Sequence, residues 1–109
     1  MARGGYLGDF EHLVLLAVLR CGDNAYGLPI RDEIVERTGR AASTGAVYAT
    51  LERLERKGLL ASRVTPGGVE RDHRPRRIYD LTGAAFDALA ETRAAIAAMS
   101  RGLRLPGAR

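Results

Sequence analysis

The sequence predicts a mainly helical domain of the α+β class, in which three helices, a two-stranded hairpin and a final helix follow one another. Three observations lead to this prediction. Apolar residues recur at helical spacing before residue 58, and two strand-like segments, residues 59–65 and 76–81, flank a loop that contains proline and glycine. Eight alanines between residues 84 and 98 then favour a helix. With 109 residues and no internal repeat, the chain is one small domain.

The first helix is expected from Asp9, its cap, to about Arg20, with residues 22–24 as the turn that ends it. Its apolar residues cover nearly all of its sides, so it should be buried on more than one side. They are Phe10, Leu13, Val14, Leu15, Leu16, Ala17, Val18 and Leu19. In so small a domain, we expect another subunit to cover the side of this helix that its own chain leaves exposed.

The second helix is expected to begin near Tyr26 to Leu28, with Asn24 as its cap, and to end at Gly39. Its apolar side would consist of Leu28, Ile30, Ile34 and Val35. Ser43 or Thr44 should cap the third helix, and Gly58 fits the left-handed position after its last turn. Val47, Leu51 and Leu54 recur at i, i+4 and i+7 and should face the core.

Thr82 should cap the last helix. This divides the domain into residues 1–82, which hold the helices and the hairpin, and residues 83–109, a C-terminal helix that ends in a frayed tail. Phe86, Leu89, Ile96 and Leu103 give this helix a broken apolar stripe, and its alanines leave room for close helix contact.

Basic residues are concentrated around the hairpin. Residues 53–77 hold eight basic and three acidic side chains, whereas residues 1–52 hold five basic and seven acidic ones. A helix with a basic end beside a basic hairpin loop is the outline of a winged helix-turn-helix that binds double-stranded DNA.

Other classes of function are disfavoured. Cys21 is the single cysteine and reads as a small buried hydrophobe, and His12 and His73 lack the spacing of a metal site. No nucleophile elbow, phosphate-binding glycine loop or acid/base pair is present, so we expect neither an enzyme nor a cofactor. The longest apolar run, residues 13–19, is too short to span a membrane, and no signal peptide is recognisable. We expect a cytoplasmic protein.

The third helix is the predicted recognition helix. Its small residues would let the backbone sit deep in a major groove, while its arginines reach phosphates or guanine edges. The residues predicted to contact DNA from this helix are Ser43, Thr44, Gly45, Tyr48, Ala49, Thr50, Arg53 and Arg56. A solvated helix face with a Glu52 to Arg56 ion pair is the alternative interpretation.

The hairpin loop holds four arginines in seven positions, which suits contact with phosphates or with a narrow minor groove. The residues predicted to bind DNA from the wing, or to contact phosphates, are Tyr26, Lys57, Arg71, Arg74, Arg76 and Arg77. For Tyr26, packing at a helix start is an equally good interpretation.

In these segments the chain resembles the PadR-like family of transcriptional regulators. The matching pieces are residues 7–16, Ala25-Tyr26-Gly27 with Ile30, Gly45-Ala46-Val47-Tyr48 with Thr50-Leu51, residues 53–59 and residues 76–82. The resemblance implies a dimeric winged helix that represses nearby genes, with Tyr48 and its neighbours on DNA. It also implies a dimer contact between the first and last helices, for which the candidates are Phe10, Leu13, Leu16, Phe86, Leu89 and Ile96.

The chain departs from the family pattern in two ways. Ala49 stands where members often have proline, so the start of the third helix can differ. The C-terminal part is a single helix, as in the small members. Some small relatives bind flat aromatic drugs between subunits with a tryptophan, and this chain has none.

The leading hypothesis is therefore a homodimeric, sequence-specific DNA-binding repressor with an inverted-repeat operator. The half-sites would lie about 34 Å apart, one turn of DNA. One alternative is a winged-helix module whose basic wing binds an acidic protein. The other is a regulator that binds a small hydrophobic effector at its dimer interface.

Overall fold

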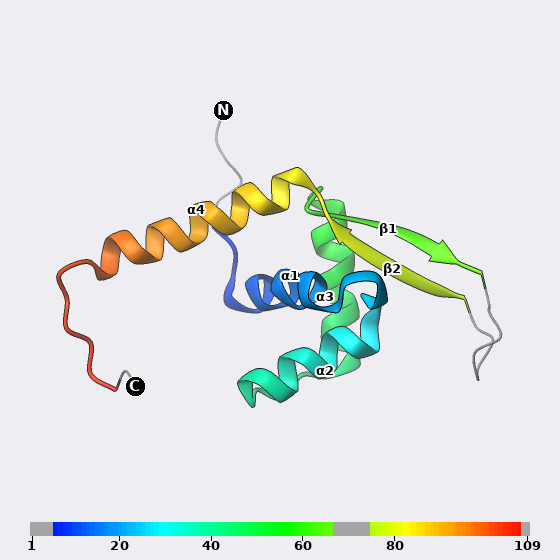
Figure 1. The fold of residues 1–109 in the computed structure, drawn as a ribbon, viewed down its shortest axis with the longest axis horizontal. Coiled ribbons are helices and arrows are strands. Elements are labelled where there is room, and N and C mark those ends of the chain that lie inside the picture. The colour runs from blue at the N-terminus through cyan, green and yellow to red at the C-terminus, as the bar shows by residue number, and fades with distance from the viewer. Residues whose placement is uncertain (1–5, 67–74, 108–109) are drawn as a thin grey trace.

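Four α-helices and a two-stranded antiparallel sheet make up the protein in a computed structural model, which describes residues 6–66 and 75–107 (Figure 1). The elements are α1 (Asp9–Cys21), the short 3-10 helix η1 (Gly22–Asn24), α2 (Gly27–Thr38), α3 (Thr44–Arg56), β1 (Leu60–Thr65), β2 (Arg76–Leu81) and α4 (Gly83–Ser100). This order confirms the predicted fold class. Within the described ranges, no helix is long and apolar enough to cross a membrane.

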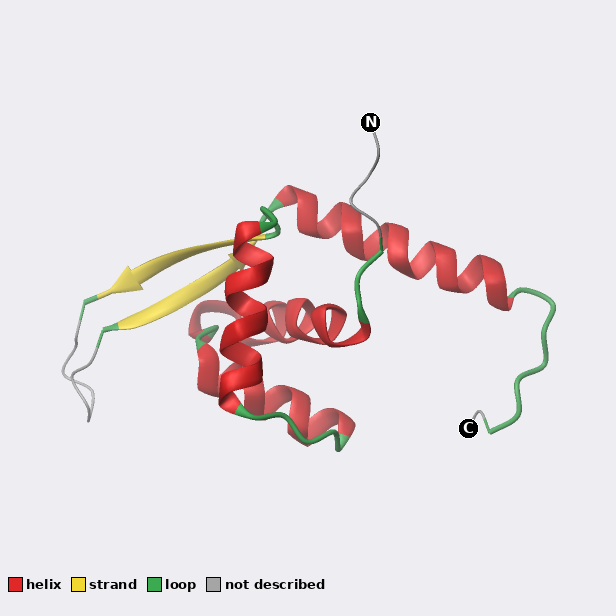
Figure 2. Ribbon diagram, turned by 180° about the vertical axis from the view of Figure 1, so that it is seen from behind, coloured by secondary structure: helices red, strands yellow, loops and turns green. Residues whose placement is uncertain are grey.

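The core lies where α1, α2 and α3 pack together. In Figure 2, α3 crosses in front of α1 and α2, the hairpin extends to one side and α4 to the other. The largest side chains that are fully buried come from these three helices: Val14, Leu15, Ile30, Val47, Leu51 and Leu54. The predicted stripe of α3 is thus confirmed.

The predicted caps are half right. Ser43 caps α3, with its Oγ accepting a hydrogen bond from the Ala46 N–H at 3.0 Å, and Thr82 caps α4 by accepting from the Ala85 N–H. Asp9 and Asn24 are not caps. Gly8 occupies the N-cap of α1 and donates its N–H to Glu11 Oε1, so the capping carboxylate comes from inside the helix.

The start of α2 also differs from the prediction. Tyr26 occupies its N-cap without a capping side-chain hydrogen bond. Asn24 is the last residue of η1 and lies two residues before this position, so it does not cap α2. Leu28, predicted to be on the apolar side, is 49% exposed, whereas Ile30 and Ile34 are buried. Gly39 ends the helix as predicted, in the left-handed conformation.

The hairpin pairs Leu60 with Leu81 at the end next to α3 and α4, and Thr65 with Arg76 at the end next to the loop, the wing base. The Tyr79 N–H donates to the Ala25 carbonyl at 2.9 Å, which attaches β2 to the segment before α2. At the other end of β2, the Thr82 hydroxyl donates to the Gly58 carbonyl, just after α3. The hairpin is therefore anchored to both helices of the helix-turn-helix.

Helix α4 projects away from the core (Figure 1). Ala85, Leu89 and Thr92 in its first part are buried, and the Thr92 Oγ1 accepts a hydrogen bond from the Leu7 N–H. Ile96 and Met99 in its last part are 59% and 79% exposed. The radius of gyration, 15.8 Å, exceeds the roughly 13 Å expected for a compact chain of this length, in keeping with this projection.

Candidate nucleic-acid interface

The side of α3 that faces away from the core carries small and charged residues. Gly45, Ala49, Glu52 and Arg56 are all exposed there, because they lie opposite the buried stripe at 100° per residue. Ser43 and Thr44, at the start of the helix, are exposed as well. Arg56 has no hydrogen bond or ion pair within the described part of the chain, and the Glu52 to Arg56 pair is not formed there. The outer face therefore lets another molecule approach the helix backbone closely and presents one unpaired guanidinium, that of Arg56.

Tyr48 lies on the flank of α3 that faces the start of α2. Its ring packs on the backbone of Gly27, where a Cβ atom would clash with it. Because Gly27 has no side chain, the ring reaches this position while remaining 49% exposed. Tyr48 is thus held at the junction of α2 and α3, next to the first turn of α2, whose N–H groups are favourable for an anion.

The base of the wing adds two arginines next to Tyr48. The Arg76 guanidinium lies 4.5 Å from the centroid of the Tyr26 ring, which is a cation–π distance. Arg77 donates to Ser62 Oγ at 2.9 Å. Tyr26, Tyr48 and both arginines line one open hollow together with Gly27, Leu28 and Pro75. The structure therefore brings together predicted residues from α2, α3 and β2.

A short hydrogen-bond chain connects the wing to α3. Ser62 on β1 donates to Glu55 Oε2 at 2.8 Å and accepts from Arg77. This chain fixes the orientation of Arg77 relative to α3. The Ser62 hydroxyl links the Arg77 guanidinium to the Glu55 carboxylate, which partly compensates the positive charge of Arg77.

The opposite flank of α3 corrects the prediction for Thr50, whereas the predicted DNA contacts of Arg53 and Lys57 stay predictions. Thr50 is only 3% exposed, so its hydroxyl does not face a phosphate; it accepts a hydrogen bond from Arg53 instead. Arg53 and Lys57 turn toward α1 and form ion pairs with Glu11, at 3.2 and 2.8 Å. The wheel positions explain this result, because all three residues lie between the buried stripe and the outer face.

Arg71 and Arg74 lie outside the described residues, so their predicted role in the wing stays a prediction. Of the arginines predicted for the wing, the structure places Arg76 and Arg77.

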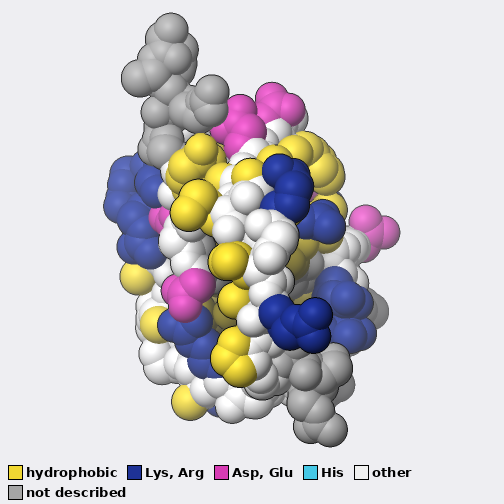
Figure 3. Space-filling model, turned by 90° about the vertical axis from the view of Figure 1, so that its left-hand side faces the viewer, with side chains coloured by type: hydrophobic (Ala, Val, Ile, Leu, Met, Phe, Trp, Pro, Cys, Tyr) yellow, Lys and Arg dark blue, Asp and Glu magenta, His cyan; other side chains and the backbone are white. Residues whose placement is uncertain are grey.

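The predicted dimer residues fall into three groups. Phe86 and Ile96 on α4 and Leu16 on α1 are exposed, while Phe10 and Leu13 are partly buried. Leu89 is only 6% exposed and belongs to the core of its own chain, which corrects its assignment to the dimer contact. Figure 3 looks onto the side of the molecule toward which α4 projects and shows several exposed hydrophobic side chains there, interspersed with charged ones.

Three further residues were missed in the sequence. Gly27 could have been noticed as a glycine in a helix start, but its contact with Tyr48 is a tertiary feature. Glu11 lies three residues after Gly8, a spacing typical of a capping carboxylate, whereas its partners on α3 gave no sequence signal. Arg40 joins the turn before α3 to α1 through Asp9 and the Phe10 ring.

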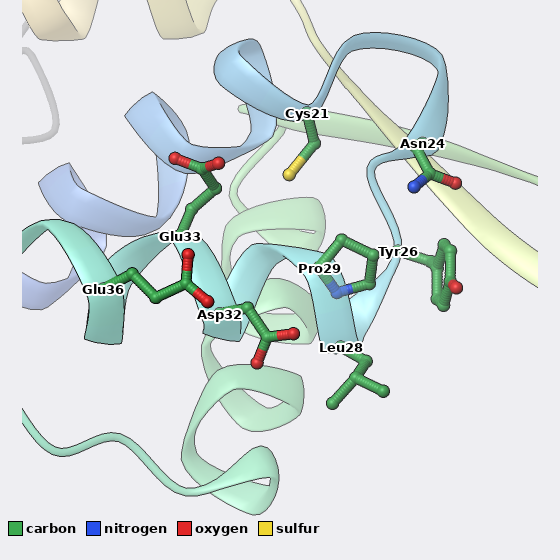
Figure 4. A pocket seen from close by; sticks show the side chains of 8 residues that line it. All are labelled: Cys21, Asn24, Tyr26, Leu28, Pro29, Asp32, Glu33 and Glu36. Atoms are coloured by element: carbon green, nitrogen blue, oxygen red, sulfur yellow. The ribbon is translucent and has the colours of Figure 1, made fainter.

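A second hollow lies between η1 and α2 and is lined by acidic side chains (Figure 4). Cys21, Asp32, Glu33 and Glu36 are among its lining residues. Burial, together with the charges of Glu33 and Asp32, raises the pKa of the Cys21 thiol, so it is protonated at neutral pH. Within residues 6–66 and 75–107, no three His, Cys, Asp or Glu side chains are placed so that they could hold a metal ion.

A helix-turn-helix with an adjoining two-stranded wing, and arginines at the wing base beside the third helix, define the winged helix-turn-helix class. The model of the transcriptional regulator PadR-like family matches residues 15–91. The chain therefore belongs to the PadR-like family of transcriptional regulators. A comparison with curated protein sequences found no match.

Solved structures share this fold. A PadR-like transcription factor from Bacteroides fragilis has a TM-score of 0.69 and 24% identity, over 84% of this chain and 82% of that one. A PadR-family regulator from Eggerthella lenta has a TM-score of 0.66 and 28% identity, over 83% and 76%. Bacillus subtilis PadR, solved in complex with operator DNA, has a TM-score of 0.64 and 21% identity, over 93% of this chain and 52% of that one.

Proposed function

We propose that this chain is a homodimeric, sequence-specific DNA-binding repressor that recognises an inverted-repeat operator. The observation that carries the proposal is the joint surface of α3 and the wing base. There, α3 exposes the small residues Gly45 and Ala49 and the unpaired Arg56. Its Tyr48 lines a hollow together with Arg76 and Arg77. The complex of Bacillus subtilis PadR with operator DNA supports this use of the fold.

The charges on this surface suit two kinds of contact. Gly45 and Ala49 allow close approach of the backbone to base edges, and Arg56 can reach a guanine or a phosphate. Arg76 and Arg77, beside the first turn of α2, suit phosphate contacts that set the position of the protein on the duplex. Sequence readout would then come from the first half of α3 and most of the affinity from the wing base.

The spacing of one row of residues along α4, all apolar except Thr92, supports the homodimer. Ala85, Leu89, Thr92, Ile96 and Met99 follow one another at intervals of four, three, four and three residues, as in a seam between packed helices. The first three are buried by their own chain, and the last two are exposed. A second copy of α4 would cover the exposed residues of this row, because its own residues have the same spacing.

The decisive experiment measures binding of the protein to duplex DNA from upstream of its own gene and to random duplexes of equal length. We expect a preference of at least about 1,000-fold for an inverted repeat, lost when about five base pairs are inserted between its half-sites. Arg56→Glu should reduce this affinity strongly. Arg101→Glu, an equal charge reversal at an exposed residue beyond α4, serves as its control. Equal, loose binding to all duplexes would instead favour a protein-interaction module.

A further inference from the structure

Glu11 is a buried carboxylate on α1 that is bound by side chains from α3. Glu11 is 8% exposed, and its Oε2 accepts hydrogen bonds from Arg53 Nε at 3.2 Å and from Lys57 Nζ at 2.8 Å. Its other oxygen, Oε1, accepts from the Gly8 N–H at 3.3 Å. One acidic group thus holds the two basic side chains on one flank of the predicted recognition helix.

The carboxylate is charged at neutral pH. Burial opposes its ionisation, but the hydrogen bonds from Lys57, the Gly8 N–H and Arg53 outweigh burial and lower the pKa of Glu11 below its ordinary value. The two cations remain accessible, since the Arg53 and Lys57 side chains are 45% and 49% exposed. Arg53 and Lys57 can therefore exchange Glu11 for another anion that approaches this flank of α3.

We infer that Glu11 is a specificity-determining residue, which competes with DNA phosphates for Arg53 and Lys57 and so restrains binding to random DNA. The inference rests on the proposed DNA-binding function. Contacts between cations and phosphates raise the affinity for all sequences equally, because the backbone carries no base information. Holding two cations on an internal carboxylate lowers that sequence-independent term and leaves contacts to base edges unchanged.

The competition also has a geometric basis. Arg53 is held by two acceptors, Glu11 and Thr50 Oγ1, so its guanidinium must give up two hydrogen bonds to reach a phosphate. Lys57 has a single acceptor in Glu11 and a flexible stem. Of the two, Lys57 is therefore the side chain that should leave Glu11 more readily.

The test compares Glu11→Gln with Glu36→Gln on a random-sequence duplex between 50 and 200 mM salt. Each variant removes one negative charge, but Glu36 is an exposed residue of α2 on the side of the acidic hollow. We expect Glu11→Gln to bind random DNA about tenfold more tightly at low salt. Its plot of log K against log salt should be steeper by about 0.9 per phosphate gained, up to about 1.8 for two. Glu36→Gln should keep the parent slope.

A second variant tests the inference without altering Glu11. Lys57→Gln should leave the salt slope of the parent protein unchanged, and in the Glu11→Gln background it should reduce the slope by about 0.9, the contribution of one phosphate contact. A parent slope that Lys57→Gln flattens by about 0.9 would show that Lys57 already contacts phosphate, and would overturn the inference. An unchanged slope for folded Glu11→Gln would overturn it as well.

Thermal unfolding of each variant checks that it folds, and if Glu11→Gln does not fold, Lys57→Gln in the parent decides the question. Failure of the proposed function has a different signature. In that case the parent shows no preference for its upstream DNA, whatever the salt slopes of the variants on random duplexes are.

Discussion

The ring of Tyr48, a predicted DNA-contacting residue, lies on the backbone of Gly27 and keeps this position because residue 27 has no side chain. The contact joins the start of α2 to α3, the predicted recognition helix, at the edge of the hollow that Arg76 and Arg77 also line. It makes residue 27 a positioning residue for the proposed interface.

Gly27→Ala should displace the Tyr48 ring, lower the affinity for the operator and destabilise the fold by about 1–3 kcal/mol through overpacking. DNA titrations and urea unfolding measure the two effects. Gly83→Ala is the matched control, because a Cβ at residue 83 meets no atom within 4 Å. In a double-mutant cycle, Gly27→Ala should cost less stability in a Tyr48→Ala background than in the parent. Equal costs would show that the ring is not what the new methyl group displaces.

Ile96→Glu should weaken the proposed dimer, with a dissociation constant raised about 10- to 100-fold, because a carboxylate would replace an apolar side chain in the seam of α4. Sedimentation over a range of protein concentrations measures this effect. Ala98→Glu adds the same charge on the opposite side of the helix, at an exposed residue, and should leave the dimer intact. The seam would be wrongly placed if Ala98→Glu were the more disruptive change.

Glu11 should make the stability sensitive to acid. Its pKa in the folded protein lies below the ordinary value of 4.5, so its contribution is complete above pH 4.5 and is lost as the pH falls through the folded pKa. Urea unfolding between pH 3 and 6 should show a steeper loss of stability for the parent than for Glu11→Gln. Parallel curves for the two proteins would argue against an ion triad that is stable in solution.

His12 should add a second pH dependence at higher pH. Burial and the nearby positive charge of Arg93 lower the pKa of His12 below 6.5, so the neutral imidazole is the favoured form in the folded protein. Its stabilisation is complete above pH 6.5 and is lost as the pH falls through the folded pKa. His12→Gln should flatten the stability profile just below pH 6.5, and Arg93→Gln should flatten it in part. A parent profile that is level there would contradict this assignment.

Local sequence signals were sufficient for most of the fold. Ser43 and Thr82 were recognised as caps, and Gly39 and Gly58 as helix ends, because each acts within its own segment. The predictions that Asp9 and Asn24 are caps were wrong. The same local rules allow several neighbouring residues as caps, and tertiary contacts decide which of them caps the helix. The glycine-containing loop also separated the two strands correctly.

The candidate interface was predictable only in part, for a physical reason. A helical wheel orients residues relative to the core of a helix but does not say which neighbour covers each flank. Tyr48 and Arg53 both lie on flanks of α3, yet one packs on Gly27 and the other pairs with Glu11. Leu89 was misassigned for the same reason, because the stripe of α4 is shared between the chain's own core and the exposed end.

If α4 pairs as proposed, its divided stripe would make gene control depend on the abundance of the protein. Under the proposed pairing, the exposed half of the seam is completed only when two molecules meet, so at low concentration the paired form rises with the square of the total protein. A cell that doubles its supply would roughly quadruple the DNA-binding species. Repression would therefore begin above a threshold of expression rather than in proportion to it.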